Sequence, residues 1–250
     1  KDLEALRKVF DGLILYGYHE SSTPRILAVA KTLKFRAVLL GIWEVKSADE
    51  IDGVAKLARQ HQYNFALAVR VGNEGIAFNR YESEDLTIAV DRLRRHLPKG
   101  IPITTSEPMK GYGMSKVVRE LGDFLAPNIH PVFHQPKLSI ADAAAWAREE
   151  AMELGRELKK PVLLQETGYA HGGRAKCSVA NQTAFWKAYL KPGHLTWSGD
   201  RWHCFSSAFE AFDLPWKAQA SGLPVEKHWG FFSVDRKPYP ALDVWKKYSE

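Results

Sequence analysis

The chain has 250 residues, of which 45% are hydrophobic and 26% are charged, proportions that are ordinary for a globular protein. No run of about 18 apolar residues is present, so we expect no membrane-spanning helix and no direct membrane insertion of this chain. The charged start, Lys1–Glu4, does not resemble a signal peptide. We predict a single domain over residues 1–250, the length that an α/β barrel typically needs, about 250 residues.

The charge balance favours a solvated surface over a nucleic-acid partner. The chain has 35 basic and 29 acidic residues, a net charge of +6 and a pI near 9.2. The basic residues are spread singly through helical patterns, with only short groups such as Arg94-Arg95 and Lys159-Lys160. A nucleic-acid-binding protein would gather them on one face or helix. A mild preference for polyanionic surroundings is the alternative.

Cysteine and histidine usage gives no sign of a metal site or a cofactor. Cys177 lies in a glycine-rich loop and Cys204 begins a predicted strand, so a disulfide between them is not favoured. Neither has the spacing of zinc ligands. His130 and His134 are four residues apart but fall on a strand end and a loop, where helical spacing cannot align them. We expect no cofactor and no metal.

Strand-like and helical patterns alternate along the chain. Before the first strand, Leu3, Leu6, Val9 and Phe10 have the spacing of one helix face. Seven apolar, β-favouring runs then follow: Leu13–Tyr18, Ala37–Trp43, Phe65–Val71, Ile101–Ser106, Phe124–His130, Pro161–Gln165 and Phe205–Phe212.

The spans between these runs carry helix signals. Thr23-Pro24 supplies a cap and a first-turn proline, and Ser47–Glu50 reads as a capping box. Asp85–Leu97 has one apolar face, Ser139 precedes an alanine-rich helix, and Tyr239–Tyr248 reads as a last helix. The alternation predicts βαβ units and a parallel sheet. We predict a (β/α)8 TIM barrel whose first strand is missing from this chain, with an open seven-stranded sheet as the alternative.

Polar and acidic residues follow nearly every predicted strand. In a parallel barrel, catalytic groups lie at these carboxyl ends. They are His19-Glu20, Trp43-Glu44, Asn73-Glu74, Ser106-Glu107, His130-Pro131, Glu166-Thr167 and Glu210–Asp213. Any single glutamate among them could instead cap a helix or pair with a cation, and His130 could be a core histidine.

Two phrases stand out: Val71-Gly-Asn-Glu74 and Gln165-Glu-Thr-Gly168. In each, an apolar strand-like run ends in a glutamate and a loop glycine lies close by. Two carboxylates at the ends of two strands can perform glycoside hydrolysis, one protonating the leaving oxygen and the other attacking the anomeric carbon.

Aromatic residues add to this prediction, because a ring stacked on a sugar face buries apolar surface at little entropic cost. Trp43, Trp216 and Trp229 are the candidates, with a core position as the alternative for Trp229. Trp146, Trp186 and Trp245 lie on helical patterns and are assigned to the core. Trp197 and Trp202 fall in a long loop without assignment.

These motifs resemble those of glycoside hydrolase family 17, the retaining β-1,3-glucanases and β-glucan transglycosylases. The likeness covers nearly the whole chain, and it looks closest to the bacterial branch. Besides the two phrases, the matching segments are Thr104–Pro108, Asn128–Pro131, Phe209–Lys217 and Val225–Phe232.

The resemblance implies roles for individual residues. Glu74 resembles the family's general acid/base, Glu166 its nucleophile, and Asn73 the residue that hydrogen-bonds the sugar 2-hydroxyl. Lys217 would help to keep Glu74 ionised. The further substrate-binding residues implied are Glu107, His130, Tyr169, Glu210, Trp216, Lys217, Glu226 and Trp229.

The chain departs from the family pattern at two positions. The family often has a tyrosine on the sixth strand near the nucleophile, but here that segment offers His130 and Val132. Either His130 orients Glu166 or the tyrosine contact is missing. Tyr169 stands where many relatives have tryptophan.

The resemblance implies hydrolysis of β-1,3-linked glucans by double displacement, with a β-glucan oligo- or polysaccharide as the substrate. Transglycosylation by the same carboxylates and non-catalytic glucan binding are the alternatives. It also implies an extracytoplasmic location, in the periplasm, the cell envelope or secreted. Attachment to a larger membrane-bound protein is a further expectation from the bacterial branch.

Overall fold

The computed structural model describes residues 1–190, 195–198, 201–205 and 207–249, and the chain divides into two compact units. One unit comprises Lys1 and Leu3–Ala126, and the other comprises Asp2 and the chain from Pro127 onward. The single domain over residues 1–250 stays a prediction.

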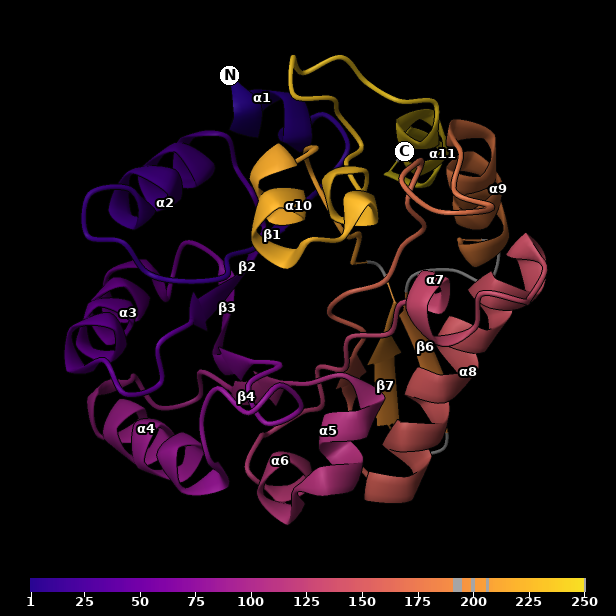
Figure 1. Ribbon diagram of the computed structural model, residues 1–250. Helices are drawn as coiled ribbons and strands as arrows, with labels where there is room; N and C mark the ends of the chain where they lie inside the picture. Colours follow the sequence, from indigo (N-terminus) through magenta and orange to yellow (C-terminus); the bar gives the residue numbers. More distant parts are fainter. Residues whose placement is uncertain (191–194, 199–200, 206, 250) are drawn as a thin grey trace. The chain divides into compact units, whose positions relative to one another are not determined.

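The first unit is built on a four-stranded parallel sheet with the order β1-β2-β3-β4. The strands are β1 (Gly12–Ile14), β2 (Ala37–Ile42), β3 (Ala66–Asn73) and β4 (Ile103–Ser106). The helices are α1 (Asp2–Arg7), α2 (Thr23–Thr32), α3 (Ala48–His61), α4 (Ser83–His96), α5 (Met109–Met114) and α6 (Lys116–Glu120). Helices α2, α3 and α4 connect successive strands and lie on the outer side of the sheet (Figure 1). This is the predicted βαβ arrangement.

Burial explains why these strands and helices form where they do. From Val38 to Ile42 every residue of β2 is buried, which suits a parallel strand covered on both faces. Helix α4 buries Leu86 and Leu93 on its inner face. Helix α2 begins at Thr23, as predicted, but the capping position is Ser22, and the Thr23 hydroxyl accepts a hydrogen bond from the His19 amide at 2.9 Å.

The predicted capping box at the start of α3 is only half formed. The Ser47 hydroxyl accepts the Glu50 amide at 3.2 Å, as a cap should. The buried Glu50 carboxylate instead accepts the backbone amides of Tyr18, Trp43 and Glu44, each at 2.8 Å. One helix side chain therefore fixes the loops that follow β1 and β2.

The second unit contains a three-stranded sheet with the order β5-β7-β6. Its strands are β5 (Val162–Leu163), β6 (Leu195–Ser198) and β7 (Arg201–Cys204). Strand β5 runs parallel to β7, and β6 is antiparallel to it. The helices are α7 (Pro131–His134), α8 (Ile140–Leu158), α9 (Val179–Tyr189), α10 (Pro215–Ser221), the 3-10 helix η1 (Pro224–Lys227) and α11 (Ala241–Ser249).

Aromatic side chains form much of the core of the second unit. The Trp186 ring lies 5.2 Å from that of Trp245 and 5.4 Å from that of Phe231. All three are buried, which confirms the core assignment of Trp186 and Trp245. Trp146 is only half-buried and lies beside His134.

The predicted strands of the second unit differ most from the structure. The run Phe124–His130 forms isolated bridges at Leu125 and Asn128 instead of a strand, and Pro161–Gln165 shortens to β5. The predicted strand Phe205–Phe212 is wrong: residue 206 lies outside the described residues, and in the remainder only Phe212 makes a bridge. The strand lies earlier, at β7, because β6 and β7 pair as a hairpin in which Trp197 is opposite Trp202.

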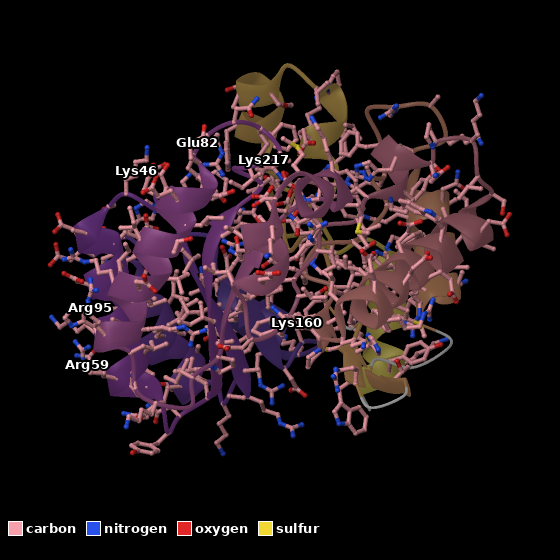
Figure 2. All side chains as sticks on the ribbon, turned by 90° about the horizontal axis from the view of Figure 1, so that it is seen from below. Lys46, Arg59, Glu82, Arg95, Lys160 and Lys217 are labelled. Atoms are coloured by element: carbon pink, nitrogen blue, oxygen red, sulfur yellow. The ribbon has the colours of Figure 1, made fainter. Side chains whose placement is uncertain are left out.

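The charged surface agrees with the sequence composition. Figure 2 shows the labelled Lys46, Arg59 and Arg95 at the outer surface of the first unit, where they are exposed. Lys46 pairs with Asp85 at 3.1 Å. No disulfide joins Cys177 to Cys204. Among the described residues, no helix is both long enough and apolar enough to cross a membrane.

Candidate active site

In the first unit, Asn73 and Glu74 follow a β-bulge at the end of β3. The pairing of β3 with β4 shifts between Arg70 and Asn73, and Asn73 then lies opposite Ser106. Gly72 has φ +73°, which glycine adopts at little cost. Glu74 itself has φ +58°, unusual for a residue with a side chain, and its amide donates to the Ser106 carbonyl at 2.7 Å. Such backbone strain is typical of functional sites.

Arg70 on β3 holds the Asn73 side chain through a hydrogen bond. Its guanidinium is fully buried, donates to the Asn73 side-chain oxygen at 3.2 Å, and donates to the Tyr16 carbonyl at 2.9 Å. Gly41 leaves room for it, since a Cβ there would lie 2.7 Å from an Arg70 nitrogen. Sequence reasoning missed Arg70, although a lone arginine in an apolar strand was a usable signal.

Glu107, predicted to bind substrate, faces the interior of the first unit. Its side chain is fully buried, and its two oxygens accept the amides of Ile76 at 2.9 Å and Ala77 at 3.1 Å. Burial raises the pKa of Glu107, while these amide hydrogen bonds oppose the rise. The arrangement holds the loop after Glu74 and leaves no exposed carboxylate surface for a sugar.

Trp43 is the exposed aromatic residue at the end of β2. It is 38% exposed, and the Arg80 guanidinium lies 4.3 Å from its ring centre. Arg80 also donates to the Asn73 carbonyl. The Trp43 amide donates to the Glu50 carboxylate at 2.8 Å. The exposed Trp43 ring therefore stands on a fixed backbone, with the Arg80 guanidinium over it.

In the second unit, Glu166 lies just beyond β5, held by backbone pairing with the segment around Asn128. Its carbonyl accepts the Ile129 amide at 2.8 Å, and the preceding Gln165 donates its side-chain amide to Asn128 at 3.3 Å. The Glu166 side chain is buried. The segment Phe124–His130, although it is not a continuous strand, therefore still holds the backbone of Glu166 in place.

His130 contacts the Glu166 carboxylate directly. The distance from His130 Nε2 to Glu166 Oε2 is 3.1 Å, and both side chains are buried. The imidazole is held edge-on by Trp229 and Phe209, each with its ring centre 5.0 Å away. This contact is the one that the first of the two sequence-based alternatives requires, in which His130 orients Glu166, and the orienting role itself stays a prediction.

Glu210, Lys217 and Glu226 form an ion-pair cluster in the second unit. The Lys217 ammonium lies 3.3 Å from Glu210 and 3.4 Å from Glu226, and 4.3 Å from the Phe209 ring centre. Burial raises the pKa of Glu210 to about 7, with Glu166 and Glu226 adding repulsion and Lys217 opposing the rise. Glu210 therefore changes protonation near neutral pH.

Besides Glu107, two further predicted substrate contacts, Trp229 and Tyr169, are corrected, and Trp216 is exposed as expected. Trp229 is fully buried between His130 and Phe209, so it is not an exposed sugar platform. Tyr169 is buried against Phe185, with ring centres 5.6 Å apart. Both burials result from tertiary packing that a strand-end position does not reveal. Trp216, on α10, is 60% exposed and available to a ligand.

The fold is that of glycoside hydrolases of the (β/α) barrel class. The structure matches a β-1,3-glucanase and allergen of Cryptomeria japonica pollen with a TM-score of 0.72 at 15% identity, over 95% of this chain and 92% of that one. It matches a β-D-glucuronidase from Dictyoglomus thermophilum with a TM-score of 0.70 at 15% identity, over 100% of this chain and 46% of that one.

Residues 1–230 match the family model of the BtgE/BtgC glycoside hydrolase domain, and the chain belongs to that family. This membership confirms the resemblance to the family-17 type of glycosidase that the motifs predicted.

Two curated relatives of this chain are fungal proteins. A glucan 1,3-beta-glucosidase of Arthroderma benhamiae is 27% identical over 95% of this chain and 84% of its own length. A probable glucan endo-1,3-beta-glucosidase, btgC, of Aspergillus fumigatus is 24% identical over 98% of this chain and 39% of its own length. The chain thus spans well under half of the second relative. The expected likeness to a bacterial branch has no support from these relatives.

Proposed function

We propose that this domain hydrolyses β-1,3-linked glucans with retention of anomeric configuration. The observation that carries the proposal is the buried Glu166 at a strand end, with His130 Nε2 3.1 Å from its carboxylate. A carboxylate held in one orientation suits a nucleophile, because in-line attack depends on its geometry. The names of the fungal relatives and of the pollen enzyme support the choice of β-1,3-glucan.

In the proposed reaction, a Glu166 oxygen forms a bond to the anomeric carbon as the glycosidic bond breaks. The electron pair of that bond goes to the departing oxygen, which takes a proton from Glu74. Glu74 then removes a proton from water, whose oxygen displaces Glu166 and restores both groups. The mechanism requires carboxyl groups about 5–5.5 Å apart when substrate is bound.

Supporting roles follow from the geometry within each unit. Asn73, oriented by Arg70, would bind the sugar 2-hydroxyl, a contact that strengthens in the transition state. His130 would keep the Glu166 carboxylate in its attacking orientation. Trp43 and Trp216 would stack on sugar faces. Glu210, Lys217 and Glu226 would contact sugar hydroxyls through a network that changes charge near neutral pH.

Product analysis on linear β-1,3-gluco-oligosaccharides tests the proposal, with Glu166→Gln as the inactive control. Shortened products whose new reducing end is first seen as the β-anomer by proton NMR would support retaining hydrolysis. Lengthened or branched products would identify a transglycosylase, and binding without turnover would identify a glucan-binding protein. An initial α-anomer would mean inversion and would refute the proposed role of Glu166.

We also propose that the protein acts outside the cytoplasm, because β-glucans of this kind are envelope polymers. Fractionation of the producing cells, followed by immunodetection of this domain, tests the location. Detection confined to the cytoplasmic fraction would contradict it.

A further inference from the structure

We propose that Glu107 and Tyr81 act as positioning residues for Glu74. They would hold the loop Gly75–Arg80 in the one conformation that aims the Glu74 carboxyl group at the glycosidic oxygen. The inference rests on the proposed function for the role of Glu74, and it replaces the substrate contact predicted for Glu107 with a different task. All the groups involved belong to the first unit.

Hydrogen bonds tie three consecutive amides after Glu74 to these two side chains. The Gly75 amide donates to the Tyr81 hydroxyl at 3.1 Å, and the amides of Ile76 and Ala77 donate to the Glu107 carboxylate at 2.9 and 3.1 Å. The Tyr81 hydroxyl in turn donates to Glu107 at 3.4 Å. A buried carboxylate thus orders the backbone that leaves Glu74 and serves no exposed face.

Close packing of Tyr81 against Gly72 and Gly75 also holds this loop in one conformation. A Cβ at Gly75 would lie 1.9 Å from the Tyr81 ring, and a Cβ at Gly72 would lie 2.2 Å from the Tyr81 hydroxyl. Glycine on both sides of Asn73-Glu74 therefore allows the Tyr81 ring to press against the backbone. A Cβ at Gly111 of α5 would lie 2.7 Å from a Glu107 oxygen, so this helix closes the opposite side.

The backbone of Glu74 explains why such support is needed. Its φ of +58° is disfavoured for a residue with a Cβ, so an unsupported loop would relax toward ordinary angles. Relaxation would swing the Cα–Cβ bond and with it the carboxyl group. General acid catalysis depends on hydrogen-bond reach to the departing oxygen, so a small swing reduces the rate.

The test compares two substrates that differ in their need for a general acid. A β-1,3-gluco-oligosaccharide has a poor leaving group, whereas a 2,4-dinitrophenyl β-glycoside leaves without protonation. For Glu107→Gln we expect kcat/KM on the oligosaccharide to fall roughly 10- to 100-fold, part of the 10²–10⁴-fold that a general acid contributes. The loss on the dinitrophenyl substrate should be at least about tenfold smaller.

Glu74→Ala provides the reference for complete loss of the acid/base, and the exposed Glu84→Gln on α4 is the matched control for the same chemical change. Azide should accelerate turnover of the dinitrophenyl substrate by Glu74→Ala and, more weakly, by Glu107→Gln, because it needs no general base. The limb of the pH profile that reports Glu74 should also shift in Glu107→Gln.

Equal losses on the two substrates, or an oligosaccharide rate equal to that of Glu84→Gln, would overturn the inference. If Glu107→Gln does not fold, Tyr81→Phe decides by the same comparison, because it removes only the hydroxyl that holds Gly75. Wild-type protein inactive on both substrates would refute the proposed function and this inference together. Active wild-type protein with an insensitive Glu107→Gln and Tyr81→Phe would refute this inference alone.

Discussion

Replacing Glu210 by glutamine should remove the contribution of this one group to the pH dependence of stability. Burial is the main cause that raises the pKa of Glu210 from 4.5 to about 7. The folded state therefore binds the Glu210 proton more tightly than the unfolded state does. Stability from this group is fully present below about pH 4.5 and is lost as the pH rises through about 7.

The size of the effect follows from the shift. A difference of about 2.5 pKa units at 1.36 kcal/mol each gives about 3 kcal/mol, an order-of-magnitude value. Glutamine resembles the protonated carboxyl group and does not ionise, so the Glu210→Gln variant does not lose this stability as the pH rises. The free energy of unfolding of wild type relative to Glu210→Gln should therefore fall by about 3 kcal/mol between about pH 4 and pH 8.

Urea unfolding of both proteins across this pH range measures the difference, and other titrating groups cancel in it. Exposed Glu20→Gln is the control and should track wild type. Lys217→Met should move the transition to higher pH, since Lys217 favours the ionised form, and Glu166→Gln should move it to lower pH. A difference between wild type and Glu210→Gln that stays constant with pH would refute the reasoning.

Two further predictions concern the site. His130→Ala should lower kcat/KM on β-1,3-gluco-oligosaccharides roughly 10- to 100-fold. It should also move the acid limb of the pH–rate profile to higher pH, because Glu166 loses a hydrogen bond to its charged form. A pH–rate profile that does not move would argue against the orienting role of His130. Trp43→Ala, made in the Glu166→Gln background, should weaken oligosaccharide binding about tenfold by calorimetry, or about 1.4 kcal/mol, and Trp43→Phe should recover part of it. Equal affinity of Trp43→Ala and its parent would exclude stacking on this ring.

Much of the first unit could be predicted because its signals are local. Continuous apolar runs mark β2 and β3, and helix caps such as Ser47 mark the starts of the helices between them. The second unit was harder. Strand β5 is two residues long, and the hairpin of β6 and β7 contains polar residues such as His203, which is buried only because of tertiary packing.

In the candidate site, too, features with local sequence signals could be predicted and features set by tertiary packing could not. That Glu74 and Glu166 follow strands could be predicted from the apolar runs before them. The direction in which a strand-end side chain points could not, so Glu107 and Trp229 were both expected to face substrate and both are buried. The lone arginine in the apolar strand marked Arg70 as unusual, but its role could not be predicted because that role depends on its acceptors, Asn73 and Tyr16, which only the structure gives.

The three amide contacts of Glu50 have a consequence for how this domain can change. The loops after β1 and β2, including the one that presents Trp43, are fixed by one carboxylate on α3 and not only by their own sequences. A loop taken alone from a relative would not bring the carboxylate that binds its amides, because that carboxylate belongs to α3. Loops and helix therefore form one exchangeable module, and new substrate preferences at this edge should be sought by grafting the module whole.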